Sequence, residues 1–211
     1  MPKIPLLTTK SDTYLTIDSP AKGMFKDKGS KFLSFAFPVK DEKEIKTKVD
    51  QLRKEYFDAR HHCYAYRLGA DKQVFRVNDD GEPSGTAGKP IFGQIVSKEL
   101  TNILIVVVRY FGGTLLGTGG LINAYRTASL DALTNASIIQ KYVYAVYGIE
   151  FDYLQLNQVM KIAKDFDAEV FDQQFEMICR MKLKIKVSFV NSALSKLNLI
   201  EHLKINYIGS E

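Results

Sequence analysis

The sequence predicts an α+β protein of two domains, and three features support this fold class. Helical and strand periodicities both occur, so neither element accounts for the chain alone. Nine of the 14 glycines fall between residues 81 and 120, and eight of these nine lie in two loops that each lead into a helix. After residue 137 the pattern changes to alternating strands separated by two helices. A chain of 211 residues holds one or two domains, and we place them at 1–137 and 138–211.

The first domain is expected to begin with strands and one helix. Asp41, with Glu44 three residues later, is typical of a helix start, and apolar residues at helical spacing predict a helix over 41–56. A turn at 28–30 joins two strands into a hairpin. Alternating patterns bounded by turn residues predict strands at 13–18, 21–26, 32–39, 62–68 and 73–77.

Two glycine loops occupy the rest of the first domain. The first covers 78–90 and leads into a helix near 88–98, where Pro90 suits the first helical turn. A continuous apolar run at 102–109 is typical of a strand that is buried on both faces. The second loop follows this strand and opens a helix at about 120–135.

The second domain has the order β-α-β-β-α-β, which predicts a ferredoxin-like arrangement. Asp152 and Asn191 are expected to cap its two helices. The strands are predicted at 142–151, 169–174, 177–190 and 204–208.

Composition excludes several classes of protein. With 45% hydrophobic and 25% charged residues, the chain is neither disordered nor collagen-like. The longest aliphatic run, Ile103–Val108, is far shorter than the roughly 20 residues that span a bilayer, and no signal peptide is evident. Cys63 and Cys179 are too few for a disulfide framework, which fits a reducing compartment. We therefore expect a soluble, cytoplasmic protein that has no membrane partner.

The net charge of +5 lies entirely in the first two thirds of the chain. Residues 1–139 contain 20 Lys and Arg against 15 Asp and Glu, whereas the remaining residues contain nine of each. Such a balance permits contact with nucleic acid or the ribosome without requiring it.

Two basic clusters are candidate nucleic-acid surfaces. One row alternates with apolar residues and so lies on one face of a strand, where it either tracks phosphates or forms a solvated sheet face. Its members are Arg180, Lys182, Lys184 and Lys186. The other cluster surrounds the first hairpin and consists of Lys22, Lys26, Lys28 and Lys31.

Each glycine loop nearly matches a phosphate-binding motif. Pro83 and Pro90 stand where a P-loop needs a glycine and a Mg²⁺-binding hydroxyl. The second loop lacks the last glycine of the dinucleotide fingerprint. Because a helix N-terminus attracts anions, one interpretation is a phosphate or carboxylate site at Gly117–Gly120 with Arg109 and Lys89 as cationic neighbours. The other is that these glycines only permit tight turns and close packing.

Neither the acidic nor the His/Cys cluster predicts a catalytic centre. His61 and Cys63 share one face of a strand while His62 points to the other, so too few ligands converge for zinc and packed residues are favoured. Turn and cap roles are favoured over metal binding or acid–base chemistry for Asp79, Asp80 and Glu82. We expect no catalytic residue, no metal and no cofactor.

Long motifs in this chain resemble those of the IMPACT family. They run in order from Lys28–Phe32 through Ala59–Arg67 and Asn78–Ile91 to Val107–Leu121. The C-terminal domain is similar to that of the bacterial, YigZ-like branch of this family.

The resemblance implies a fold and a field of action. The N-terminal domain would share the β/α fold of a ribosomal small-subunit protein domain and of domain IV of elongation factor G. The C-terminal domain would be ferredoxin-like, similar to the last domain of that factor. Eukaryotic relatives regulate translation by competing for the activator of a starvation-responsive kinase, a pathway that bacteria lack. What transfers is a translation-linked role, through RNA, the ribosome or a protein partner in translation control.

Two functional hypotheses follow. The first is a non-enzymatic regulator that binds RNA or the ribosome through the basic strand faces and the glycine loops. The second is an enzyme or sensor that binds a small phosphate or carboxylate metabolite at loops 78–91 and 109–121. Its candidate residues are Asp79, Asp80, Glu82, Ser84, Thr86, Lys89, Arg109, Gly112, Gly113, Gly117, Gly119 and Gly120.

Overall fold

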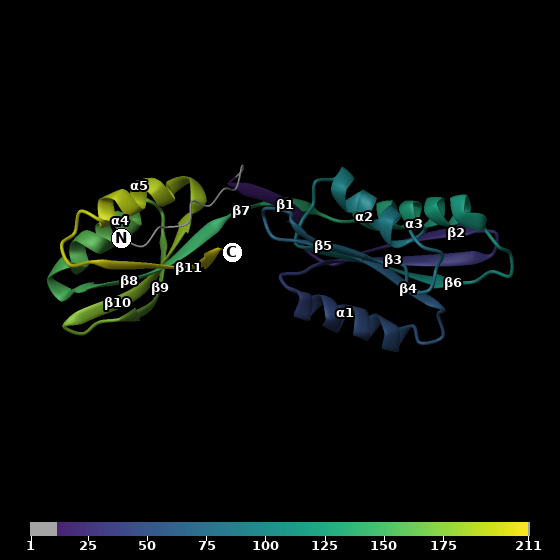
Figure 1. Ribbon diagram of the computed structural model, residues 1–211, viewed down its shortest axis with the longest axis horizontal. Coiled ribbons are helices and arrows are strands. Elements are labelled where there is room, and N and C mark those ends of the chain that lie inside the picture. The colour runs from purple at the N-terminus through teal and green to yellow at the C-terminus, as the bar shows by residue number, and fades with distance from the viewer. Residues whose placement is uncertain (1–11, 211) are drawn as a thin grey trace. The chain divides into compact units, whose positions relative to one another are not determined.

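The computed structural model describes residues 12–210 and divides them into two compact units: an N-terminal unit of residues 14–141, and a C-terminal unit of residues 142–210 that also includes residues 12 and 13. Each unit has its own sheet and helices (Figure 1). The structure confirms a mixed α/β protein with several sheets. Within the described residues, no helix combines the length and the apolar character needed to cross a membrane.

The N-terminal unit is built on a five-stranded antiparallel sheet with the strand order β2-β3-β6-β4-β5. Helix α1 (Glu42–Glu55) covers one face, and α2 (Gly88–Ser97) and α3 (Gly117–Thr134) cover the other (Figure 1). The strands are β2 (Ala21–Asp27), β3 (Ser30–Pro38), β4 (His61–Leu68), β5 (Val74–Asn78) and β6 (Ile103–Tyr110).

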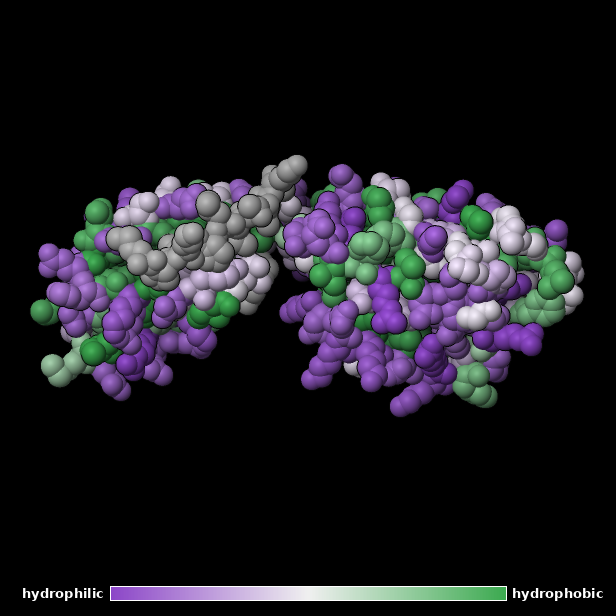
Figure 2. All heavy atoms as spheres, viewed as in Figure 1, coloured by the Kyte–Doolittle hydropathy of each residue, from purple (hydrophilic) through white to green (hydrophobic). Residues whose placement is uncertain are grey.

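Strand β6 lies at the centre of this sheet, and its side chains supply both cores. Ile105 and Val107 pack beneath α2 and α3, whereas Leu104 and Val106 pack against α1. All of its residues except the last are buried. This double burial explains the continuous apolar run in the sequence. Hydrophilic residues gather along the side of the unit where α1 lies (Figure 2).

The boundary between the units lies four residues after the predicted one, because an additional strand forms there. Strand β7 (Ile138–Tyr142) pairs with β1 (Thr13–Ile17) in a separate two-stranded sheet. The sequence pattern did not indicate β7, whose residues are mostly exposed and carry little alternation.

The C-terminal unit contains a four-stranded antiparallel sheet with the order β11-β8-β10-β9. Helices α4 (Leu156–Asp165) and α5 (Val187–Leu197) share one apolar core with the inner face of the sheet. A single 3₁₀ turn, η1 (Tyr153–Gln155), precedes α4. The strands are β8 (Tyr144–Asp152), β9 (Glu169–Gln174), β10 (Ile178–Lys186) and β11 (Lys204–Ser210).

Two predicted boundaries are wrong. Strand β10 ends at Lys186 and α5 begins at Val187, so Asn191 is an interior residue of the helix and not its cap. Residues 187–190 have strand propensity, but burial of Val190 beside Ala193, Leu194 and Leu197 at helical spacing overrides it. Helix α3 begins at Gly117, three residues earlier than predicted.

Two close approaches of the backbone bring distant segments together in the N-terminal unit. A Cβ on Gly112 would lie 1.9 Å from the carbonyl carbon of Gly29, so the β2–β3 turn touches the loop between β6 and α3. The Gly112 N–H donates to Oγ of Ser30 at 3.1 Å. A Cβ on Gly23 would lie 2.2 Å from the backbone nitrogen of Ala132, which places α3 directly against β2. Only glycine permits these distances.

Gly112→Ala is therefore expected to lower the free energy of unfolding by about 3 kcal/mol, because the added methyl group overlaps backbone that cannot move away. Gly119→Ala is the matched control, since a Cβ there meets no atom within 4 Å and the residue already lies in α3. The control should change stability by less than about 1 kcal/mol. Chemical denaturation compares the two variants, and equal effects would contradict the packing argument.

Candidate functional site

The candidate site lies at one end of the N-terminal sheet, below the two glycine loops. Phe32, Arg109 and His61 are register partners on the neighbouring strands β3, β6 and β4, so their side chains form a row on the face that α2 and α3 cover. The loop between β5 and α2 and the start of α3 close over this row.

A buried ion pair occupies the centre of the site. Oε1 of Glu82 accepts hydrogen bonds from Nη1 of Arg109 at 2.6 Å and from the Tyr125 hydroxyl at 2.7 Å. Nε2 of His61 lies 4.0 Å from the same oxygen. The side chains of Glu82 and Arg109 are only 3% and 7% exposed. The pair therefore links the first glycine loop, the central strand and α3 through one carboxylate.

The guanidinium of Arg109 also lies between two aromatic rings. Its central carbon is 5.4 Å from the ring centroid of Phe32 and 5.8 Å from that of Phe111. Its Nε is buried without a hydrogen-bond acceptor among the described residues. Arg109 thus keeps hydrogen-bonding capacity that the ion pair with Glu82 does not use.

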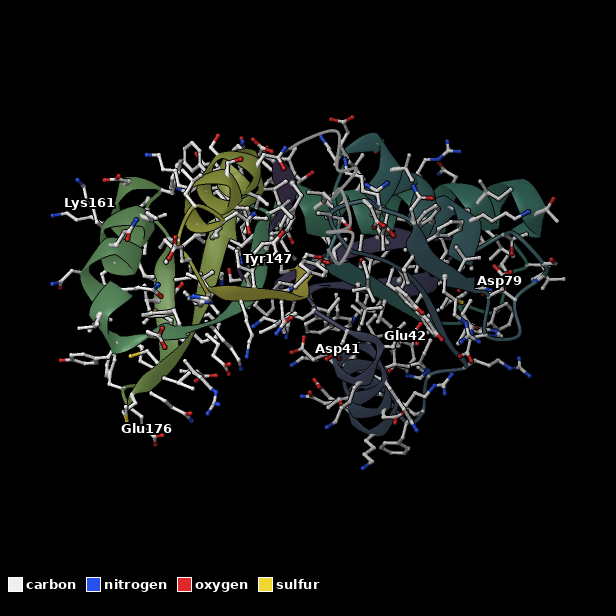
Figure 3. The ribbon with its side chains drawn as sticks, turned by 60° about the vertical axis from the view of Figure 1, so that its left-hand side comes forward. Asp41, Glu42, Asp79, Tyr147, Lys161 and Glu176 are labelled. Carbon is white, nitrogen blue, oxygen red and sulfur yellow. The ribbon has the colours of Figure 1, made fainter. Side chains whose placement is uncertain are left out.

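Asp79 caps helix α2 from a distance in the sequence. Its carboxylate accepts from the backbone N–H groups of Gly85, Ala87 and Gly88 at 2.9, 3.1 and 2.8 Å. Burial alone would raise the pKa of Asp79, but these three donors outweigh it, and the pKa lies below its usual value. Figure 3 shows Asp79 within this loop region. The first glycine loop is thereby folded around its own carboxylate.

Asp80 ties α1 to β4 and does not point toward Glu82. Its carboxylate pairs with Arg53 at 2.7 Å and accepts from the His62 backbone N–H at 2.6 Å. Burial lowers the pKa of His62, although Asp80 partly opposes this shift. The three neighbouring carboxylates thus have separate partners and do not converge on one centre. Residues 12–210 contain no group of three His, Cys, Asp or Glu side chains placed to hold a metal ion.

Cys63 is not positioned as a nucleophile. Its Sγ donates to the backbone oxygen of Asp79 at 3.0 Å and lies 3.3 Å from the Tyr125 hydroxyl. Burial raises the pKa of the Cys63 thiol, so the group stays protonated at neutral pH. His61 turns its Nδ1 toward the backbone oxygen of Asp80 at 2.8 Å.

A cavity of about 340 Å³ opens beside the buried ion pair. Of the predicted loop residues, Glu82, Arg109 and Gly117 line it, whereas Lys89 does not. Ser84, Thr86, Gly112, Gly113, Gly119 and Gly120 also lie outside its lining. The remaining lining residues are Arg60, His61, Pro83, Phe111, Leu115, Leu116, Thr118 and Leu121.

Sequence reasoning missed Arg60, Phe111 and Tyr125. Arg60 directly precedes β4, and its backbone N–H donates to the Arg109 carbonyl at 3.3 Å. Only the pairing of β4 with β6 brings these two arginines together. The signal for Phe111 was its position between Arg109 and the paired glycines of the second loop. Tyr125 could not be separated from ordinary core residues of an amphipathic helix.

The basic row on β10 is largely occupied by acidic partners. Arg180 pairs with Glu150 at 2.8 Å, Lys182 with Asp172 at 2.7 Å and Lys186 with Asp167 at 2.9 Å. The Nζ atom of Lys184 lies 5.1 Å from the ring centroid of Tyr144. The predicted alternation is present, and the cations share one face. Carboxylates from adjacent segments neutralise most of that face.

The hairpin lysines differ from the basic row. Lys26, Lys28 and Lys31 are exposed around the β2–β3 turn, and none forms an ion pair with a residue in the described part of the chain. We call these three residues the cationic hairpin. The contact between Gly29 and Gly112 places it beside the second glycine loop.

Glu82→Leu is expected to lower the free energy of unfolding by about 3–5 kcal/mol, because it leaves the buried Arg109 guanidinium without its counter-charge. Adding Arg109→Met should recover most of this loss, since no uncompensated charge then remains. Denaturant unfolding of the single and double variants measures both effects. A double variant no more stable than Glu82→Leu would show that the loss does not arise from an unpaired charge.

Asp79→Asn is expected to cost about 1–2 kcal/mol of stability at pH 7, because an amide N–H₂ replaces one of the two oxygens that accept from Gly85, Ala87 and Gly88 and leaves a backbone donor unpaired. Because the folded protein lowers the pKa of Asp79, this stabilisation is present above the ordinary value of about 3.9 and is lost as the pH falls through the folded value. Urea unfolding at pH 7 and pH 3 should show a smaller difference between wild type and variant at pH 3. A difference that does not change with pH would count against the cap.

Comparison with known proteins places this site in a family. The Impact N-terminal domain matches residues 28–133, which include Lys28 and Lys31 of the cationic hairpin, both glycine loops and most of α3. The chain is 32% identical to the IMPACT family member YigZ of Escherichia coli over 88% of this chain and 92% of that protein. Protein IMPACT of Homo sapiens is 35% identical over 43% of this chain and 29% of that protein.

A solved structure supports the same relationship across both units. It is described as the crystal structure of a hypothetical protein, is 31% identical in sequence, and superimposes with a TM-score of 0.73. The match covers 94% of this chain and 98% of that one. Motifs, domain match and full-length similarity agree, and the chain belongs to the IMPACT family.

Proposed function

We propose that this protein regulates translation in the cytoplasm by binding RNA or the ribosome, and that the cationic hairpin and the adjoining glycine loop form its main contact surface. The field of action comes from the family resemblance, since eukaryotic relatives act in translation control. The observation that carries the proposed surface is the cationic hairpin, whose three exposed lysines have no acidic partner among residues 12–210. A phosphate backbone can therefore approach without displacing an existing ion pair.

The folds that the resemblance implies belong to the same proposal. Two helices on one face of a β11-β8-β10-β9 sheet support a ferredoxin-like assignment for the C-terminal unit. We likewise assign the N-terminal unit to the fold of elongation factor G domain IV. Both assignments fit a protein that acts on the translation machinery.

The basic row on β10 is the secondary surface in this proposal. Arg180, Lys182 and Lys186 already have carboxylate partners at 2.7–2.9 Å. A phosphate would have to replace these partners, so each contact would add less to the affinity than a contact with an unpaired lysine. We therefore expect the row to modulate binding that the hairpin begins.

A small phosphate or carboxylate metabolite is the second candidate ligand. The cavity beside Arg109 favours it, because two arginines and a helix N-terminus line it. The buried thiol of Cys63 and the separate partners of Asp79 and Asp80 favour binding over catalysis.

The triple variant Lys26→Gln, Lys28→Gln, Lys31→Gln should weaken binding to ribosomes and to a 20-nucleotide single-stranded RNA. Removing three phosphate contacts should also flatten the slope of log affinity against log salt by about 2. Fluorescence anisotropy over a salt series measures the RNA, and sucrose-gradient sedimentation at low and moderate salt measures the ribosome.

The matched control is Lys43→Gln, Lys46→Gln, Lys54→Gln, which makes the same charge change at exposed positions of α1. Equal losses in both triple variants would indicate nonspecific attraction and would reject the hairpin as the contact surface. Absence of any salt-sensitive binding by the wild type would reject the proposed function itself.

A further inference from the structure

The start of α3 provides donors that the protein does not use. Gly117 to Gly120 form the first turn of an 18-residue helix, and no side chain caps it. Among residues 12–210, no backbone oxygen outside the helix accepts from the N–H groups of Gly117, Thr118 or Gly119. The N–H groups of Gly117, Thr118 and Gly119, at the first three positions of the helix, have no acceptor within it, and together with the helix dipole they make this turn attractive to an anion.

Arg109 is the second, independent indication of a ligand. It is 6% exposed, lines the cavity together with Gly117 and Thr118, and holds a buried Nε that has no acceptor in the described part of the chain. The Nε atom itself is too deeply buried to reach a ligand, but the Arg109 guanidinium places a positive charge in the cavity wall that Glu82 alone accompanies among the described residues. Arg60, which is exposed at the rim, adds a second cation that is free to move toward a bound group.

Much of the remaining cavity wall is apolar, and two of its apolar side chains are exposed. Phe111 is 45% exposed and Leu115 is 83% exposed, although both lie beside a charged centre. Pale and green residues gather at the end of the N-terminal unit where Figure 1 places the loop between β6 and α3 (Figure 2). An exposed phenyl ring next to an anion-binding helix start suits a ligand that joins a flat ring to a phosphate.

Glu82 determines which end of the cavity takes the negative charge. Its carboxylate lies in the wall and is shared by Arg109 and Tyr125, so a phosphate beside it would be repelled. The phosphate therefore belongs at the α3 turn near Arg60, and the ring lies against Phe111 and Leu115. A volume of about 340 Å³ is at the small end of ligand cavities, which fits one nucleotide.

From this geometry we infer that the cavity binds a single nucleotide, with its phosphate at the first turn of α3 and its base stacked on Phe111. The inference rests on the proposed function, because it assigns the chemistry by which the same end of the molecule recognises RNA. The nucleotide is either one unpaired nucleotide of an RNA chain or a free mononucleotide.

Phe111→Ala tests the stacking contact, and Phe57→Ala is its matched control, because Phe57 is an 83% exposed phenylalanine of the same unit outside the cavity lining. Arg60→Gln tests the cation, with Lys54→Gln as its control. The ligands are AMP, CMP, GMP, UMP, inorganic phosphate and the 20-nucleotide RNA, measured by calorimetry and thermal unfolding. We expect Phe111→Ala to weaken nucleotide or RNA binding about tenfold and Phe57→Ala to leave it unchanged.

Comparing these ligands distinguishes a nucleotide within RNA from a free mononucleotide. Tenfold weaker RNA binding by Phe111→Ala, with no binding of mononucleotides to the wild type, assigns the cavity to a nucleotide within RNA. Mononucleotide binding that depends on Phe111 and Arg60 assigns it to a free nucleotide. If neither substitution changes the affinity for any of these ligands, the inference is overturned.

The proposed function is tested separately by the same measurements. RNA binding that depends on the cationic hairpin but not on Phe111 or Arg60 would overturn the cavity assignment and leave the proposed function standing. Mononucleotide binding without RNA or ribosome binding would overturn the proposed function and leave the cavity assignment standing.

Discussion

The structure of the N-terminal unit depends on the buried contact between Glu82 and Arg109. Glu82 comes from a loop with no regular structure, and Arg109 comes from the central strand. A charged group is stable in such a place only when it is paired, so the loop must keep the conformation that delivers the carboxylate. Tyr125 donates to the same oxygen and extends the constraint to α3. One carboxylate thus determines where the loop and the helix lie relative to the sheet.

Two further contacts hold the glycine loops at one end of the sheet. The first loop folds around Asp79, which satisfies three backbone N–H groups at the start of α2. The second loop is held by the approach of Gly112 to Gly29. With these groups satisfied internally, the cavity at this end presents the first turn of α3, the exposed Arg60 and an apolar rim. This end of the N-terminal unit therefore presents three different kinds of contact to a ligand: backbone N–H groups, a cation and apolar side chains.

Much of the fold could be predicted from sequence, because its signals are local. The buried strand β6 appears as a continuous apolar run, and Asp41 marks the start of α1, where it accepts from Glu44. The separate roles of the carboxylates could not be predicted, since Asp80 reaches Arg53 on another element. The acidic partners of the basic row on β10 could not be predicted from the sequence either. They lie on neighbouring segments whose register is set only when the sheet forms.

Helix α3 also determines which side of the N-terminal sheet is accessible to another chain. It presses against the edge strand β2 at Gly23, and Asp131 accepts the Met24 backbone N–H at 2.8 Å. A strand edge with its amide engaged in this way is a poor template for further pairing. The opposite edge is β5, where Val74 and Phe75 are half exposed. Sheet extension, by a second copy or by an extended peptide, is thereby directed to β5 and away from the edge beside the cationic hairpin.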